Sequence, residues 1–247
     1  MFPINRNQFK QIIKNNVLLP AFIFDKKCDA KKAFEDHIDA GANVIVAPTY
    51  LYNNENDKKR ILKETVVCAG EKTFVAGAVY ANSEKTVFSG GKLSFDTYYK
   101  IICEDIKSLH ETFPFAMLFL MGFDTLAEAK YAVYAAKEAC DVPICLCFDF
   151  KSENVLSDGY NIETSIIILQ SLGVDCVGVQ AESPDLVFDI LLDMKEFASV
   201  PLFAVSDANE FIAPYELAEY TQNFVNNKCV MVAGGRGTDS RHTAEIA

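Results

Sequence analysis

The sequence predicts an α/β protein, a single (β/α)8 TIM barrel, and three observations support this prediction. Eight short apolar runs alternate with longer amphipathic segments along the 247 residues. Each run is continuously hydrophobic, which is typical of parallel strands buried on both faces. The length suits one barrel, and no linker or composition shift divides residues 1–247. An open doubly wound sheet is the alternative, but eight evenly spaced units favour closure into a barrel.

The expected elements follow one another in regular order. A short N-terminal helix over 6–15 precedes the first strand, and the chain ends a few residues into a truncated last helix. We expect strands at 17–24, 43–48, 73–79, 115–121, 142–148, 175–180, 200–205 and 228–233. The clearest amphipathic helices cover 30–40, 126–140, 163–172, 185–198 and 214–227.

Two residue patterns recur in the loops between helices and strands. Gly41 and Gly173 stand where a helix must end in a left-handed residue, which glycine adopts without steric penalty. Pro143 and Pro201 open the strands that follow two other helices, and Pro214 suits the first turn of a helix. The positions of these glycines and prolines therefore agree with the predicted strand and helix boundaries.

Composition excludes several classes of partner. The chain has 34 acidic and 23 basic residues, a formal net charge of −11, and shows no basic stripe. This acidity argues against nucleic-acid binding, which needs clustered Lys and Arg. No apolar run is long enough to span a membrane, and the first residues lack a signal-peptide pattern. The eight cysteines form no C-x-x-C pair and mostly lie in apolar runs, so we expect reduced core thiols in a cytoplasmic protein without a membrane partner.

Short motifs occur at 37–50, 74–77, 125–130, 156–159, 172–179 and 232–238. In this order, the six segments resemble motifs of the homocysteine S-methyltransferase family. They cover nearly the whole chain, and the last of them, in the place of the family's Gly-Gly-Cys-Cys-Gly-Thr, has His242 near the family's following histidine. The resemblance implies a barrel of a methyltransferase family.

Departures from the family pattern fall on its metal site. In the family, one cysteine after strand six and two in the strand-eight loop bind Zn²⁺, which holds and deprotonates the homocysteine thiol. Here Ala181 and Arg236 occupy these places, so we expect no metal and no cofactor. Family positions that hold the amino acid substrate are changed too, to Pro20-Ala21, Pro48 and Met121.

Barrel active sites lie at the carboxyl ends of the strands, so candidate side chains are read from each strand end. The resulting mouth residues are Asp25, Thr49, Tyr50, Tyr80, Asn82, Phe123, Asp124, Asp149, Lys151, Gln180, Glu182, Ser206, Asp207 and Arg236.

The segment Gly234, Gly235, Arg236, Gly237 and Thr238 is the most suggestive ligand-binding candidate. Glycines let backbone N–H groups approach a ligand, and Arg236 could clamp a carboxylate or phosphate with two hydrogen bonds. The alternative is that the glycines only form a tight turn and that Arg236 pairs with Asp207 or Glu182.

A second candidate is a carboxylate cluster for acid–base work. Asp149, Glu182 and Asp207 would serve this chemistry if they lie close together, with Thr49 and Gln180 as further ligand contacts. The alternative is that these carboxylates cap helices or pair with Arg236. A replacement metal site from Cys147, Asp149 and His242 is not expected, because the chain has three histidines and none at ligand spacing.

Three functional hypotheses follow. The first is a methyltransferase-family enzyme for a small thiol or amino acid-like substrate, without zinc-dependent methyl transfer to homocysteine. The second is a non-catalytic binding or partner subunit. The third is a repurposed barrel enzyme that binds a small anionic ligand at the strand-eight loop.

Overall fold

Eight parallel strands lie side by side in the order in which they occur along the chain. The computed structural model describes residues 4–24, 29–71, 73–81, 86–87, 90–150, 155–208 and 212–247. The sequential strand order confirms the predicted barrel, since a doubly wound sheet reverses its order. The strands are β1 (Pro20–Ala21), β2 (Val44–Val46), β3 (Phe74–Tyr80), β4 (Met117–Phe123), β5 (Ile144–Asp149), β6 (Cys176–Ala181), β7 (Leu202–Ser206) and β8 (Cys229–Gly234).

The sheet closes where its first and last strands meet. The Leu18 amide donates to the Val230 carbonyl (2.8 Å), and the Val232 amide donates to the Leu18 carbonyl (3.1 Å). β1 is shorter than predicted because regular pairing with β2 covers two residues only. Its neighbour Leu19 donates its amide to the Asn43 side chain instead (2.9 Å), and Pro20 has no N–H to donate.

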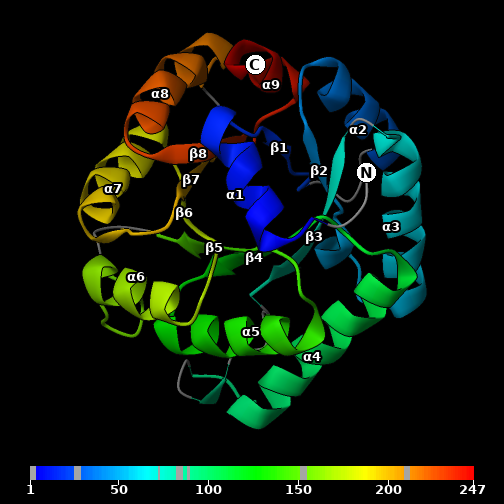
Figure 1. The fold of residues 1–247 in the computed structure, drawn as a ribbon, viewed down its shortest axis with the longest axis vertical. Coiled ribbons are helices and arrows are strands. Elements are labelled where there is room, and N and C mark those ends of the chain that lie inside the picture. The colour runs from blue at the N-terminus through cyan, green and yellow to red at the C-terminus, as the bar shows by residue number, and fades with distance from the viewer. Residues whose placement is uncertain are drawn as a thin grey trace.

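Helices form a ring around the barrel (Figure 1). The five predicted helices are confirmed to within one or two residues. Two helices, α3 (Glu55–Ala69) and α4 (Phe95–Thr112), were not predicted. α3 opens with six charged or amide residues, 55–60, that conceal its apolar side. The helices are α1 (Arg6–Asn15), α2 (Ala30–Asp39), α3 (Glu55–Ala69), α4 (Phe95–Thr112), α5 (Leu126–Ala139), α6 (Ile162–Ser171), α7 (Pro184–Phe197), α8 (Pro214–Asn226) and α9 (Ser240–Ile246), with a 3-10 turn η1 (Thr49–Leu51).

Backbone details confirm the predicted joints. Gly41 and Gly173 adopt φ values of +104° and +83°, which residues with a side chain rarely reach. None of the helices in the described part of the chain combines the length and the apolar character that crossing a bilayer requires.

Three strands, β4, β5 and β7, begin two residues later than predicted. β4 does so because Phe115 lies before the strand and packs its ring over Gly77. A Cβ atom on Gly77 would lie 2.9 Å from that ring, so a glycine is needed there.

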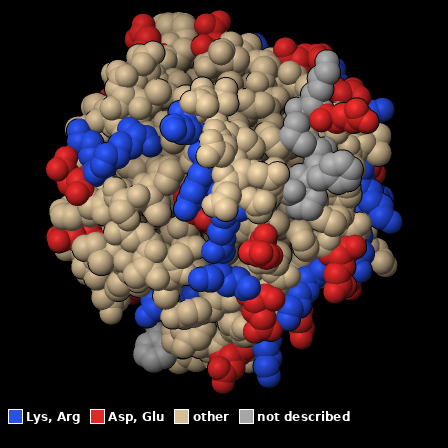
Figure 2. All heavy atoms as spheres, in the orientation of Figure 1, with Lys and Arg blue, Asp and Glu red and all other residues tan. Residues whose placement is uncertain are grey.

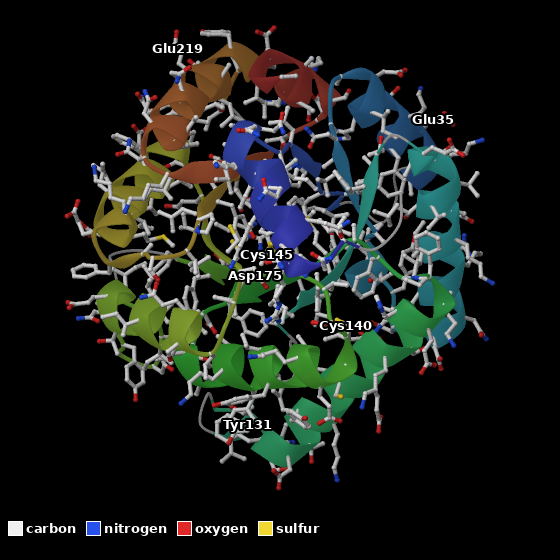
Figure 3. All side chains as sticks on the ribbon, viewed as in Figure 1. Glu35, Tyr131, Cys140, Cys145, Asp175 and Glu219 are labelled. Carbon is white, nitrogen blue, oxygen red and sulfur yellow. The ribbon has the colours of Figure 1, made fainter. Side chains whose placement is uncertain are left out.

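The barrel interior is packed solid with apolar side chains from successive strands. Phe119 and Phe203 meet edge to face with ring centroids 5.7 Å apart, and Gly178 leaves the space that the Phe203 ring fills. Cys145 and Cys147 on β5 belong to this same cluster, as predicted for core thiols, and Cys145 is seen inside the ring of strands in Figure 3. The interior is therefore a core rather than a channel.

α1 closes one end of the barrel. Phe9 and Ile13 are buried against the interior cluster, and Figure 1 shows the helix lying across the barrel opening. Arg6 Nε lies 3.3 Å from Asp175 Oδ2, and Asp175 directly precedes β6. α1 thus covers the amino ends of the strands and leaves the carboxyl ends open as the mouth.

Replacing Phe9 with alanine should remove the buried ring by which α1 covers this end of the barrel. We expect the free energy of unfolding in urea to fall by about 3–5 kcal/mol, the usual cost of emptying a buried phenylalanine site. The matched control is Phe197→Ala at the end of α7, where the ring is 38% exposed. The control should lose under about 1 kcal/mol, and equal losses in both variants would contradict the role given to α1.

Candidate functional site

The polar residues at the mouth gather around Asp207, which follows β7. Its Oδ1 atom accepts hydrogen bonds from the Gln180 side-chain amide (2.9 Å) and from the backbone N–H of Arg236 (2.8 Å). Its Oδ2 atom accepts from the Arg236 guanidinium (3.2 Å). Asp207 is 5% exposed and Gln180 is fully buried. The structure thus joins the ends of β6, β7 and β8 through one carboxylate.

Arg236 lies between two carboxylates. Besides Asp207, its guanidinium reaches Asp149 at the end of β5, with 3.6 Å between NH2 and Oδ2. The Arg236 side chain remains 54% exposed, whereas the Asp207 side chain is almost completely covered. Burial raises the pKa of the Asp207 carboxyl above its ordinary value, although the hydrogen bonds from Gln180 and Arg236 oppose this shift.

Gln180 also links this cluster to the opposite side of the barrel. The Tyr80 hydroxyl, at the end of β3, donates to Gln180 Oε1 (3.3 Å). The Tyr80 ring contacts Tyr50 with centroids 4.6 Å apart, and the Tyr50 hydroxyl donates to the Ile23 carbonyl (2.8 Å). Phe24 adds a third ring, 6.0 Å from Tyr80. One side of the mouth is therefore aromatic and the other ionic.

The glycines after β8 are required by close packing. A Cβ atom on Gly235 would lie 2.0 Å from Asp207 Oδ1, and one on Gly237 would lie 2.0 Å from the Ala208 carbonyl oxygen. Gly234 would meet Thr238 Oγ1 at 2.3 Å, and that hydroxyl donates to the Gly235 carbonyl (2.7 Å). The segment forms the tight turn considered above, and its role as a ligand site stays a prediction.

Other predicted mouth residues lie outside the cluster. Glu182 is exposed at the approach to α7, and among the described residues the ion pairs of Arg236 are with Asp149 and Asp207 rather than with Glu182. Thr49 is buried and donates its hydroxyl to the Ala78 carbonyl (3.3 Å). The Asp124 side chain accepts from Ser157. Asp25, Asn82 and Lys151 fall outside the described residues.

Among the described residues, a cysteine of β5 lies beneath the cluster. Cys147 is fully buried in the barrel interior, two residues before Asp149 on β5. Burial raises the pKa of the Cys147 thiol well above its ordinary value, and the carboxylates of Asp149 and Asp207 add to the shift. A thiol in this environment stays protonated and is a poor metal ligand. In the part of the chain that the structure describes, no three His, Cys, Asp or Glu side chains are grouped to hold a metal ion.

A pocket of about 520 Å³ adjoins the cluster, between α2 and the segment 235–240. His37 of α2 lines it, and its Nδ1 atom lies 2.9 Å from Thr243 Oγ1 on α9. Burial lowers the pKa of His37, and Asp239 and Asp36 oppose this only in part. Sequence reasoning did not select this histidine, since it lies on a helix rather than at a strand end.

A closed ring of eight parallel strands with polar groups at the carboxyl ends defines a (β/α)8 barrel with a candidate site at its mouth. The family model for homocysteine S-methyltransferase matches residues 6–247, so the chain belongs to this family. The predicted resemblance is thereby confirmed.

Solved structures agree on the fold. The Escherichia coli homocysteine methyltransferase MmuM in its metallated form superposes with a TM-score of 0.79 at 14% identity, covering 98% of this chain and 99% of MmuM. Its apo form gives 0.77 at 15% identity, with 94% and 95% covered. A type I 3-dehydroquinate dehydratase from Clostridium difficile gives 0.60 at 14% identity, with 91% and 86% covered. No curated protein matches the chain by sequence.

The buried His37 should make the fold less stable in mild acid. A histidine whose pKa is lowered on folding takes up its proton more readily in the unfolded chain, so stability is lost as pH falls through about 6.5. We expect the free energy of unfolding to drop more between about pH 7.5 and about pH 5.5 in the wild type than in His37→Gln, which keeps a polar group near Thr243. Parallel pH profiles for the two proteins would contradict this assignment.

Proposed function

We propose that this chain is a homocysteine S-methyltransferase-family barrel that does not carry out zinc-dependent methyl transfer to homocysteine. One observation carries the proposal: Arg236, held by Asp207 and Asp149, stands where the family pattern has its strand-eight thiolates. Ala181, at the end of β6, stands at the remaining thiolate position. The site therefore presents a cation and oxygen donors where Zn²⁺ would need soft anionic sulfur.

The ionic cluster is also electrostatically unsuited to a divalent cation. The Asp207 carboxylate is already engaged by three donors, and the guanidinium adds a fixed positive charge within hydrogen-bond distance of it. A metal ion would have to displace Arg236 and then find its ligands among hard oxygens. Without a metal, the thiol of homocysteine stays mostly protonated near neutral pH, since a free thiol has a pKa of about 8.5.

Purified protein should contain no stoichiometric zinc and should show no homocysteine methylation above the uncatalysed rate. Elemental analysis after growth with added zinc gives the first value, and methionine formation from homocysteine with S-methylmethionine or betaine as donor gives the second. E. coli MmuM, prepared in parallel, is the positive control. One equivalent of bound zinc together with methionine formation would overturn the proposal.

The same cluster favours an amino acid-like ligand over a simple anion. An anion at the exposed part of Arg236 must compete with Asp149 and Asp207, whose two carboxylates already outnumber the single guanidinium. A zwitterion avoids this conflict, because its ammonium group can pair with Asp149 while its carboxylate pairs with Arg236. We therefore favour an amino acid-like ligand, as in the first sequence-based hypothesis, over a simple anion, as in the third.

Titration calorimetry separates these ligands. We expect heat of binding from an amino acid such as homocysteine and little from inorganic phosphate, with the response lost in Arg236→Gln. Glu182→Gln removes an exposed carboxylate outside the cluster and should leave binding unchanged. Stronger binding of phosphate than of the amino acid would favour the anion site, and no response to either would favour a non-catalytic partner subunit.

A further inference from the structure

The closed end of the barrel carries a band of positive charge that the linear sequence conceals. We define the basic strip as Arg6, Lys10, Lys14, Lys137, Lys195 and Lys228. The sequence showed no basic stripe because these residues come from four separate parts of the chain: α1, the end of α5, the end of α7, and the residue before β8. Figure 2 shows Lys and Arg atoms running across the middle of this face and toward one side.

Two sets of contacts join members of the strip to one another. Burial raises the pKa of the Asp175 carboxyl, and the nearby charges of Arg6, Lys10 and Lys137 oppose this rise; Arg6 Nε lies 3.3 Å from Asp175 Oδ2. Lys228 donates its Nζ hydrogen to the Lys195 carbonyl (2.6 Å), and Lys195 Nζ donates to the Asn227 side chain (2.9 Å). Figure 3 places Asp175 beside α1, and shows Glu35 and Glu219 on the outer rim of the molecule.

The spacing of the charged residues on α1 lowers the stability of that helix. Arg6, Lys10 and Lys14 follow one another at four-residue spacing, where like charges destabilise a helix. α1 contains no acidic residue, and the one ion pair of this series in the described structure joins Arg6 to Asp175. Lys10 and Lys14 are exposed and have no ion pair among the described residues. By contrast Lys31, Lys58, Lys59 and Lys107, on other helices, each pair with a carboxylate.

Helix capping accounts for only part of the strip. Lys137 Nζ donates to the Leu172 carbonyl at the end of α6 (2.8 Å), and Lys228 does the same for α7, so these two lysines stabilise helix carboxyl ends. Lys10 lies in the middle of α1 and caps nothing. Two exposed carboxylates, Asp141 and Glu196, border the strip without pairing to it in the described structure.

We propose that the basic strip is a docking surface for an acidic segment of a partner protein. The chain has a formal net charge of −11, so its overall charge repels an acidic partner, whereas the lysines of the strip attract one and orient its approach. A membrane surface fits less well, because Phe9 and Ile13 of α1 point into the barrel and leave no apolar side to insert. A long nucleic acid would extend past the strip onto acidic surface. The inference does not depend on the chemistry of the mouth.

The test uses a fluorescent ten-residue glutamate peptide as the probe and its glutamine counterpart as the neutral control. Anisotropy should show salt-sensitive binding of the glutamate peptide to the full chain and none of the glutamine peptide. The double variant Lys10→Gln/Lys14→Gln should bind the probe roughly tenfold more weakly. Lys32→Gln/Lys63→Gln is the matched control, because it removes two exposed lysines without ion pairs in the described structure from α2 and α3.

Circular dichroism and urea unfolding confirm that both variants remain folded before binding is compared. Equal losses in the two double variants, or no peptide binding by the wild type, would overturn the proposal. Tighter binding to phosphatidylserine vesicles or to a short RNA, weakened by Lys10→Gln/Lys14→Gln, would also overturn it and would assign the strip to a membrane or a nucleic acid.

Discussion

The buried carboxylate of Asp207 is the interaction on which the mouth of this barrel depends. A carboxylate removed from water must be fully hydrogen-bonded, and Asp207 meets this need with donors from β6 and from the loop after β8. The loop has to approach closely to supply them, so Gly235 stands where any side chain would strike Asp207 Oδ1. The turn after β8, the direction of Arg236 and the orientation of Gln180 all follow from this one group.

This arrangement is consistent with our proposal that this family barrel lacks the zinc centre. The fold depends on α1 covering one end of the barrel, on a closely packed interior, and on hydrogen-bonded polar groups at the mouth. None of these three features requires a metal. Gln180 extends the network to Tyr80 on the far side, so polar groups at the top of the core are paired across the barrel. Cys147 of β5 lies below this layer as part of the core. The proposed loss of the family's thiolates is therefore compatible with a stable fold.

The sequence predicted the architecture well because buried parallel strands are continuous apolar runs, and Gly41 and Gly173 mark helix ends without ambiguity. It also located Asp149, Gln180, Asp207 and Arg236 at one end, since parallel strands share their carboxyl edge. It did not determine which carboxylates pair with Arg236, because Glu182 is as close to its strand end as Asp149 and only the side-chain direction separates them. Contacts between distant residues, such as Tyr80 with Gln180 or Arg6 with Asp175, leave no local signal.

The most direct test of the central claim is anomalous X-ray diffraction at the zinc absorption edge from crystals grown with excess zinc. We predict no anomalous peak between the ends of β6 and β8, and electron density for the Arg236 guanidinium against Asp207. A zinc peak at that position, with Arg236 turned out to solvent and protein ligands around the ion, would contradict this account of the mouth.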